Sequence, residues 1–200
     1  MILIVCAVAK ELAFLEPQPH VEVLVTGVGP VDAAANVSRA LAQSPYALVI
    51  NAGIAGAFDG GAAIGDGVVV SEDAFELDLE TGEPLLLPDG LRTHGRASSD
   101  LAMVDNLVEL GFAAQRGATV ARVTATEATA VRLAQRGAQT ESMEGFAVLR
   151  AAEIAGVKAI QVRGISNRVG DRTQSRWDFN AGVTGLQRVL GALLTLTVPR

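Results

Sequence analysis

Two polar residues lie where an α/β protein could use them for chemistry. Glu144 precedes an apolar, helix-like segment, and Asn167 stands at the end of the β-rich run AIQVRGIS. In an α/β sheet, ligands bind in the crevice beyond the carboxyl ends of the strands, so both side chains could face one pocket. A carboxylate accepts hydrogen bonds from hydroxyl groups, and an amide offers a donor and an acceptor. The stretch from Ala138 to Asp171, which holds both residues, is therefore our candidate site.

Glu11 is a third candidate, just after the first apolar run. Residues Met1 to Val8 are continuously apolar and of strand length, which is typical of a strand covered on both faces. The following AKEL places Glu11 at a junction between strand and helix. A carboxylate there serves either as surface charge or as a general base, and position alone favours surface charge.

Two stretches of small residues could bring a ligand close to the main chain. In GVGP, Gly27 and Gly29 permit positive φ or close backbone approach between the strand VEVLVT and the helix VDAAANVSRALAQ, whose N-terminus favours an anion or a polar ligand edge. NAGIAGAF, residues 51–58, would either let a flat ligand lie on the backbone or form a tight packing corner. Asn51 stands where a dinucleotide fold carries an acidic residue, which argues against NAD.

The remaining pattern alternates strands with helices. It predicts strands at about 67–71 and 119–124, helices at 98–111 and 126–137, an irregular stretch from 81 to 95, and a C-terminal helix from Trp177 or Asp178 onward. Alternating elements of this kind are typical of a three-layer α/β/α sandwich. We expect an α/β fold that forms a single domain over residues 1–200.

The charge and apolar patterning limit the possible partners. The formal net charge is −6 at pH 7, whereas proteins that bind phosphate backbones have basic surfaces, so we expect a small-molecule partner and no nucleic acid. No apolar run reaches the roughly 18 residues that a bilayer span requires, so no membrane segment is expected. Lys10 and Glu11 interrupt the first apolar run where a secretory signal would continue, which favours a cytoplasmic location.

The sequence offers little for disulfide or metal chemistry. Cys6 is the single cysteine, and inside an apolar strand it is expected to be a buried structural thiol. His20 and His94 have no partner at metal-ligand spacing, so we interpret both as solvated loop residues. We expect no metal and no cofactor.

Six separated motifs together resemble the purine nucleoside phosphorylase and nucleosidase superfamily. In order along the chain they are AxxxEL, GVGPVDAAANV, VINAGIAG, GDGVVVSEDA, ESMEG and VRGISNRVGDR. The resemblance covers nearly the whole chain, and the pairing of ESMEG with VRGISN is its most specific part. It implies a phosphorylase/hydrolase-like fold with a mixed central sheet.

The resemblance also implies a reaction. Phosphorylases of the superfamily carry an Arg beside the glycine-rich loops, but TGVGPVDAA and INAGIAG contain none, which favours water over phosphate as nucleophile. Branches acting on 6-aminopurines carry Asp where this chain has Asn167. An amide can donate toward both N7 and O6 of hypoxanthine. In these respects the chain is similar to the futalosine-hydrolysing branch, which splits hypoxanthine from futalosine in an alternative menaquinone pathway.

The same resemblance assigns roles to individual residues. Glu11 would be the general base for water, and Asn167 would hold the leaving base, whose proton must come from solvent or another acid. Glu144 would bind the ribose hydroxyls, with Met143 as an apolar ribose contact. The further substrate-binding candidates are Ala55, Gly56 and, for the carboxylate of the futalosine arm, Arg172.

Other functions stay open at this level. One alternative is a methylthioadenosine/S-adenosylhomocysteine nucleosidase altered at position 167, and another is a nucleoside-binding module without turnover. Arg168 and Arg172 could equally be surface residues. The resemblance implies a homo-oligomer, a dimer or tetramer, in which a neighbouring subunit can complete the pocket.

Overall fold

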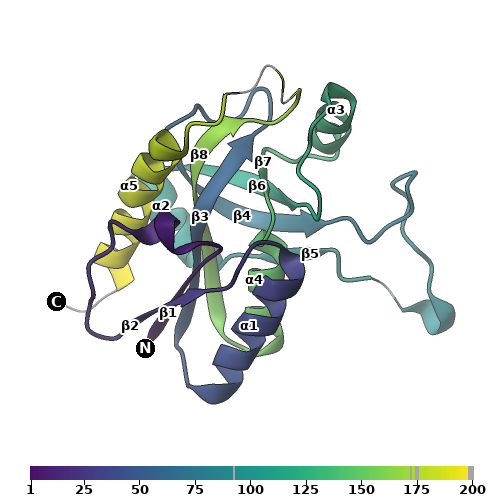
Figure 1. Ribbon diagram of the computed structural model, residues 1–200. Helices are drawn as coiled ribbons and strands as arrows, with labels where there is room; N and C mark the ends of the chain where they lie inside the picture. Colours follow the sequence, from purple (N-terminus) through teal and green to yellow (C-terminus); the bar gives the residue numbers. More distant parts are fainter. Residues whose placement is uncertain (92, 172, 174–175, 198–200) are drawn as a thin grey trace.

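A computed structural model describes residues 1–197 of the chain apart from 92, 172, 174 and 175. Within these residues, eight strands form one sheet (Figure 1). The strands are β1 (Ile2–Cys6), β2 (Val21–Val25), β3 (Leu48–Ala57), β4 (Gly67–Phe75), β5 (Arg96–Ser98), β6 (Ala113–Thr119), β7 (Thr140–Ser142) and β8 (Lys158–Arg168). The helices are α1 (Pro30–Gln43), α2 (Leu101–Glu109), α3 (Glu127–Gln135), α4 (Gly145–Ile154) and α5 (Phe179–Thr197), with short 3₁₀ turns η1 (Ala9–Leu12) and η2 (Pro88–Gly90).

The sheet is mixed. Its main order is β2-β1-β3-β7-β6-β4-β5, and β8 pairs with both β3 and β4. Strands β2, β1, β3 and β8 run parallel to their neighbours in that series, whereas β4 runs antiparallel to β8 and β7 antiparallel to β3. The parallel strands end at a common edge of the sheet, and this edge carries the candidate site.

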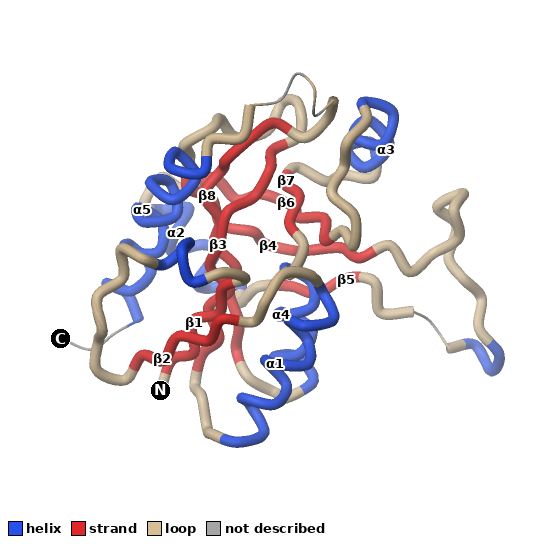
Figure 2. The backbone as a smooth tube through the Cα atoms, viewed as in Figure 1, coloured by secondary structure: helices blue, strands red, loops and turns tan. Residues whose placement is uncertain are grey.

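Helices cover both faces of this sheet, as Figures 1 and 2 show. Ile2, Ile4 and Cys6 of β1 pack in one core cluster with residues of α2 and α5. Leu3 and Val5 pack in a second cluster with residues of α1 and α4. Successive side chains of a strand point to opposite faces, so the continuously apolar β1 supplies both cores. The predicted three-layer α/β/α arrangement is therefore confirmed.

Helix boundaries follow the capping residues. Asp100 caps α2 by accepting a 3.2 Å hydrogen bond from Met103 N, and Thr126 caps α3 by accepting a 3.3 Å bond from Thr129 N. Short polar side chains at this position satisfy backbone N–H groups that a helix leaves unpaired. None of the helices in the described part of the chain has the length and apolar character needed to cross a bilayer.

The predicted strand at 119–124 is wrong. The strand is β6, which ends at Thr119 because its neighbour β4 ends at the paired residue Phe75. Residues 51–57 also continue β3 and form no corner, and the short strands β5 and β7 were not predicted. The small residues of β3 are required by close side chains, since a Cβ on Gly53 would lie 2.4 Å from Arg163 Nη1.

The stretch between β4 and β5 is the least regular part of the structure, as predicted for 81–95. It leaves the body of the protein as a long arm with η2 near its tip (Figures 1 and 2). Exposed leucines lie along it, and Leu86 is 89% exposed. The arm thus presents apolar side chains that this chain does not cover.

Candidate active site

A cavity of about 390 Å³ opens where β1, β3 and β8 end. This volume falls within the range of small-molecule sites, about 300–1,000 Å³. Segments distant in the sequence meet there. The lining residues are Ala7, Val8, Glu11, Val28, Ile54, Ala55, Gly56, Val123, Glu141, Ser142, Met143, Glu144, Ser166, Asn167, Trp177 and Phe179.

Glu11 is held in the cavity wall by the backbone. It lies in η1, and its side chain is only 4% exposed. Its Oε2 accepts 3.1 Å hydrogen bonds from Ala7 N and Val8 N, and its Oε1 accepts a 2.9 Å bond from Ile54 N. Burial raises the pKa of Glu11 above its ordinary value, and the backbone hydrogen bonds and the charge of Arg163 partly offset the rise. The result is a fixed carboxylate with increased basicity.

Arg163 is a buried cation beside Glu11. It lies on β8, is 2% exposed and does not line the cavity. Its Nη1 and Glu11 Oε1 approach the same point, since a Cβ on Gly53 would lie 2.4 Å from the first and 2.9 Å from the second. Its Nε and Nη2 have no hydrogen-bond partner in the structure. The guanidinium therefore acts on Glu11 through its charge, from behind the cavity wall.

The charge of Arg163 also acts on the buried carboxylate of Asp73. Asp73 accepts hydrogen bonds from Thr119 Oγ1 at 2.7 Å and from Gln161 Nε2 at 2.8 Å. Burial raises the pKa of Asp73, and these two bonds and the charge of Arg163 oppose the rise. The network fixes β4, β6 and β8 relative to one another.

Glu144 sits at the N-cap of α4 and reaches across to α1. Its Oε1 accepts a 2.9 Å hydrogen bond from Gly29 N, and Gly29 is the N-cap of α1 with a φ of 106°. The conformation favours glycine, as the sequence predicted for GVGP. The positive end of α1 thus binds an anion, and the anion is the protein's own carboxylate.

The amide of Asn167 has a defined orientation. Its Nδ2 donates to the carbonyl of Arg168 at 2.9 Å, and its Oδ1 accepts from Ser166 Oγ at 2.9 Å. A carbonyl can only accept, so the nitrogen must be the atom beside Arg168. The second hydrogen of Nδ2 remains available to a ligand in the cavity.

Ala55 and Gly56 form the floor beside Asn167. A Cβ on Gly56 would lie 3.0 Å from Asn167 Nδ2 and 2.6 Å from Val169 Cγ2. Only glycine therefore leaves the Asn167 amide where it is. The sequence left two readings of these small residues, a flat ligand on the backbone or tight packing, and the close contacts at Gly53 and Gly56 show tight packing within a strand.

Six of the seven site residues that we predicted line this one cavity: Glu11, Ala55, Gly56, Met143, Glu144 and Asn167. The seventh, Arg172, lies outside the described residues. Arg168 does not line the cavity, and its Nη1 donates to the carbonyl of Phe58 at 3.2 Å. The functional roles of these residues remain predictions.

Several residues around the cavity were not singled out from the sequence. The sequence does point to Arg163, because it is a charged residue inside the apolar run AIQVRGIS and charged residues are rarely buried unless they are paired. Glu141 belongs to the motif ESMEG, and this motif is the sequence signal that points to it. Trp177 and Phe179, whose rings meet edge-on at 5.8 Å, gave no local signal, because the fold brings them to the cavity.

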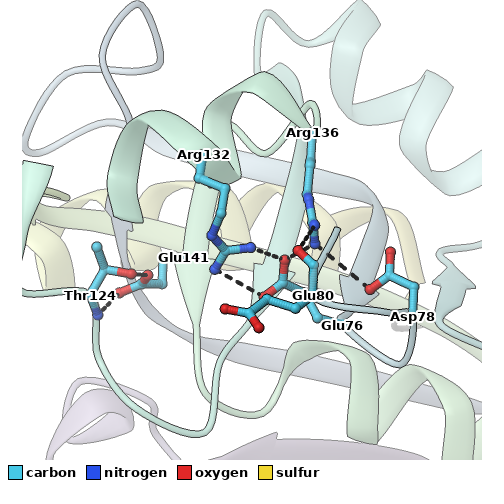
Figure 3. Close-up of polar contacts among 7 residues, drawn as sticks. All are labelled: Glu76, Asp78, Glu80, Thr124, Arg132, Arg136 and Glu141. Atoms are coloured by element: carbon cyan, nitrogen blue, oxygen red, sulfur yellow. Dashed lines mark hydrogen bonds and ion pairs between the residues drawn. The ribbon is translucent and has the colours of Figure 1, made fainter. Parts of the chain in front are cut away.

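A second cavity, of about 410 Å³, lies between the base of the arm and α3. Arg132 and Arg136 of α3 both pair with Glu76, and Arg136 Nη1 lies 3.7 Å from Asp78 Oδ1 (Figure 3). These exposed pairs join the arm to α3. In the part of the chain that the structure describes, no group of His, Cys, Asp and Glu side chains is arranged to hold a metal.

Comparisons with known proteins identify the family and the fold. The family model of the phosphorylase superfamily matches residues 9–197. The futalosine hydrolase of Acidothermus cellulolyticus is 37% identical over 212 residues, covering 94% of this chain and 84% of the relative. That of Thermus thermophilus is 33% identical over 180 residues, covering 86% and 80%. The structure of futalosine hydrolase from Helicobacter pylori matches with a TM-score of 0.82 at 14% identity, covering 98% of this chain and 97% of the other.

Proposed function

The chain belongs to the phosphorylase superfamily, and on that premise we propose that it hydrolyses the N-glycosidic bond of futalosine. The products are hypoxanthine and dehypoxanthine futalosine, an intermediate of menaquinone biosynthesis. Relatives that carry the name futalosine hydrolase align with most of the chain, which supports this substrate. A nucleoside also fits a cavity of about 390 Å³ with carboxylates, an amide and an aromatic wall.

The charge of the cavity is the observation that carries the proposal. Glu11, Glu141 and Glu144 line it, and among the described residues its wall contains no Lys, Arg or His. Three carboxylates disfavour a phosphate dianion. They favour a ribose that becomes positively charged, like an oxocarbenium ion, as the glycosidic bond breaks. The proposed nucleophile is therefore water.

Glu11 is the proposed general base. Its three backbone hydrogen bonds hold the carboxylate in place, and its raised pKa strengthens it as a proton acceptor. It takes a proton from water as the oxygen attacks the anomeric carbon from the face opposite the base. A general base of this kind contributes roughly 10²- to 10⁴-fold to the rate.

Glu144 and Met143 are the proposed ribose contacts. One oxygen of Glu144 is fixed by Gly29 N, so the other can accept hydrogen bonds from the vicinal hydroxyls. Its negative charge then lies beside the developing cation. Met143 provides an apolar surface next to the sugar.

Asn167 is proposed to hold the leaving base. Because the carbonyl of Arg168 takes one hydrogen of Nδ2, the amide has one hydrogen left, which it shares between the adjacent acceptors N7 and O6 of hypoxanthine. The amide stabilises negative charge on the departing base without giving up a proton. Ala55 and Gly56 let the flat base lie against the strand.

Trp177 and Phe179 suit the arm of futalosine. This arm carries a carboxyphenyl ketone, and aromatic rings pack well edge to face or offset. The two side chains line the cavity and present such rings. Arg172 remains our candidate for the carboxylate of the arm.

The test is to incubate the purified protein with futalosine, inosine and methylthioadenosine and to follow the free bases by chromatography. We expect hypoxanthine from futalosine, at a rate that does not depend on added phosphate. Oxygen-18 from labelled water should appear at the anomeric carbon of the sugar product. Release of adenine from methylthioadenosine at a much higher rate would identify the alternative nucleosidase, and nucleoside binding without base release would identify a binding module.

We also propose that the protein is a homo-oligomer. The arm between β4 and β5 presents exposed leucines, including Leu85, Leu86 and Leu91. Apolar side chains on a projecting segment are stabilised when a second copy buries them. Light scattering after size-exclusion chromatography should give a dimer or tetramer, and Leu86→Glu should shift the population toward the monomer.

A further inference from the structure

Helix α4 begins at Glu144, but the side chain of Glu144 does not cap it. An N-cap side chain commonly accepts a hydrogen bond from a backbone N–H in the first turn of its own helix, which the helix leaves unpaired. The carboxylate of Glu144 makes no such bond. It turns instead to Gly29 N, at the start of α1. The first turn of α4 therefore needs acceptors from other elements.

Two hydroxyl groups from neighbouring strands supply these acceptors. Phe146 N donates a 2.7 Å hydrogen bond to Oγ1 of Thr119, the last residue of β6. Gly145 N donates a longer bond, of 3.3 Å, to Oγ of Ser142 in β7. Thr119 is 2% exposed, so water does not compete for its hydroxyl group. The stronger cap of α4 is thus a residue of another strand.

Asp73 fixes the direction of the Thr119 hydroxyl group. Thr119 Oγ1 donates its single hydrogen to Asp73 Oδ1 at 2.7 Å, so its lone pairs are left for Phe146 N. Gln161 Nε2 donates to the other oxygen of Asp73 at 2.8 Å, and Asn51 Nδ2 donates to Gln161 Oε1 at 2.9 Å. Each donor in this buried chain therefore points toward the carboxylate of Asp73.

The carboxylate of Asp73 lies against the start of α4. A Cβ on Gly145 would collide with Asp73 Oδ2 and with Gln161 Oε1, so only glycine fits at this position. A helix N-terminus carries partial positive charge, which a nearby carboxylate stabilises. Asp73 and Thr119 together give α4 the negative charge and the acceptor that a capping Glu144 would otherwise provide.

We propose that Thr119 is a positioning residue for the reaction, because it caps α4 in place of Glu144 and leaves the Glu144 carboxylate free for Gly29 and the ribose. The ribose contact rests on the function proposed above. Without the Thr119 hydroxyl group, Phe146 N is a buried donor that has lost its acceptor, which is costly. The carboxylate of Glu144 is attached two residues away in the chain, and it then turns to Phe146 N and leaves the cavity.

A graded series of variants at position 119 tests the position of Glu144 directly. Thr119→Val keeps the shape of the side chain without an acceptor, Thr119→Cys has a weakly accepting thiol, and Thr119→Ser keeps the hydroxyl group. In crystal structures, Thr119→Ser should keep the 2.9 Å bond between Gly29 N and Glu144, and Thr119→Val should lose it. Thr119→Cys gives the same comparison if the valine variant does not fold. An unchanged bond in Thr119→Val, or in Thr119→Cys where that variant replaces it, would overturn the proposal.

The kinetic test uses the sugar hydroxyl groups that Glu144 is proposed to bind. Futalosine and its 2′-deoxy analogue, which lacks one of these hydroxyl groups, are compared with the native protein and the variants. The ratio of kcat/KM for futalosine to that for the analogue should fall roughly 10- to 100-fold in Thr119→Val, as expected for loss of a hydrogen bond to a charged group. Thr119→Ser should keep the native ratio. An equal loss of both activities in Thr119→Val would mean that Thr119 supports only the fold, and the proposal would fail.

Val104→Ala is the control for lost stability. Val104 is a buried residue of α2 that packs in the core and does not line the cavity. Its truncation should lower the melting temperature and leave the ratio of the two substrates unchanged. If the native protein releases no base from futalosine, the proposed function fails, and the crystal structures of the variants still test the position of Glu144 separately.

Discussion

The backbone N–H of Gly29 donates a 2.9 Å hydrogen bond to the carboxylate of Glu144, across the space between the N-termini of α1 and α4. A helix N-terminus is an anion site, and a phosphate ligand could occupy it. Here a side chain of the protein occupies it. The contact therefore blocks one position where phosphate could bind, and it places a fixed negative charge in the cavity.

Replacing Glu144 by Gln is expected to reduce kcat/KM for base release by roughly 10²- to 10³-fold, as for the loss of one preorganised electrostatic contact. The amide oxygen can still accept from Gly29 N, so the melting temperature should change little. Steady-state kinetics and thermal melting measure the two effects. Glu153→Gln, an exposed change on the same helix, is the control and should leave both values unchanged. A Glu144→Gln protein with native kcat/KM would show that the charge does not act on the ribose.

Glu11→Gln is expected to lower kcat by about 10²- to 10⁴-fold while nucleoside binding is largely kept, because the proton acceptor is lost. The Gln NH₂ group cannot accept a hydrogen bond, so the melting temperature should also fall as part of the backbone contact to Ala7, Val8 and Ile54 is lost. Turnover assays and calorimetric binding of futalosine to the variant separate the two effects. Glu16→Gln changes an exposed residue of the same segment and should retain full activity. Substantial turnover by Glu11→Gln would exclude Glu11 as the base.

The raised pKa of Glu11 also predicts the pH dependence. Burial disfavours the ionised form, so the acidic limb of kcat/KM should lie above the ordinary value of 4.5. Ionisation of Glu11 is needed for activity but lowers the free energy of unfolding. The folded state binds this proton more tightly than the unfolded state, so ionised Glu11 lowers stability above its folded pKa, and this loss is relieved as the pH falls through that pKa. A pH–rate profile with its acidic limb at or below 4.5 contradicts the effect of burial.

Much of this site follows from residue type and position, and some of it does not. The apolar run of β1 and the ends of the parallel strands locate Glu11 and Asn167, because strand ends meet at one edge of a sheet. The pairing of Gly56 with Glu141 on one side and Asn167 on the other does not follow in this way. Strand β7 has only three residues, and its partner strands come from distant segments of the chain. Sequence patterns carry no register between such strands, so the place of Glu141 opposite Asn167 was not predictable. The same holds for Arg163, whose neighbours Glu11 and Asp73 belong to other elements.

Gly56→Ala is expected to disturb base binding more than stability. The new Cβ would lie 3.0 Å from Asn167 Nδ2 and 2.6 Å from Val169 Cγ2, so both side chains must move. The KM for futalosine should rise, with a modest fall in melting temperature.

Gly191→Ala serves as a control, because Gly191 lies in α5 and a Cβ there meets nothing within 4 Å. That variant should gain about 0.5–1 kcal/mol of stability from helix propensity, with unchanged kinetics. A Gly56→Ala protein with native KM would show that the amide need not stay where it is.

Asn167→Asp is expected to shift preference from 6-oxopurines toward 6-aminopurines. In the native protein Nδ2 faces the carbonyl of Arg168 at 2.9 Å, and in the variant an oxygen takes its place. Two acceptors in contact are unfavourable, so the new acid is stabilised in its protonated form, with a raised pKa. In that form its single hydrogen lies on the carbonyl of Arg168, and its oxygens can accept from a 6-amino group, which adenine supplies and hypoxanthine does not. The ratio of kcat/KM for futalosine to that for its 6-amino analogue, which has adenine in place of hypoxanthine, should fall. The fall should be clearest at low pH, where the introduced carboxyl group is protonated.

Asn180→Asp, an exposed change in the first turn of α5, controls for added charge. Equal ratios for the native protein and Asn167→Asp would mean that residue 167 does not recognise the base.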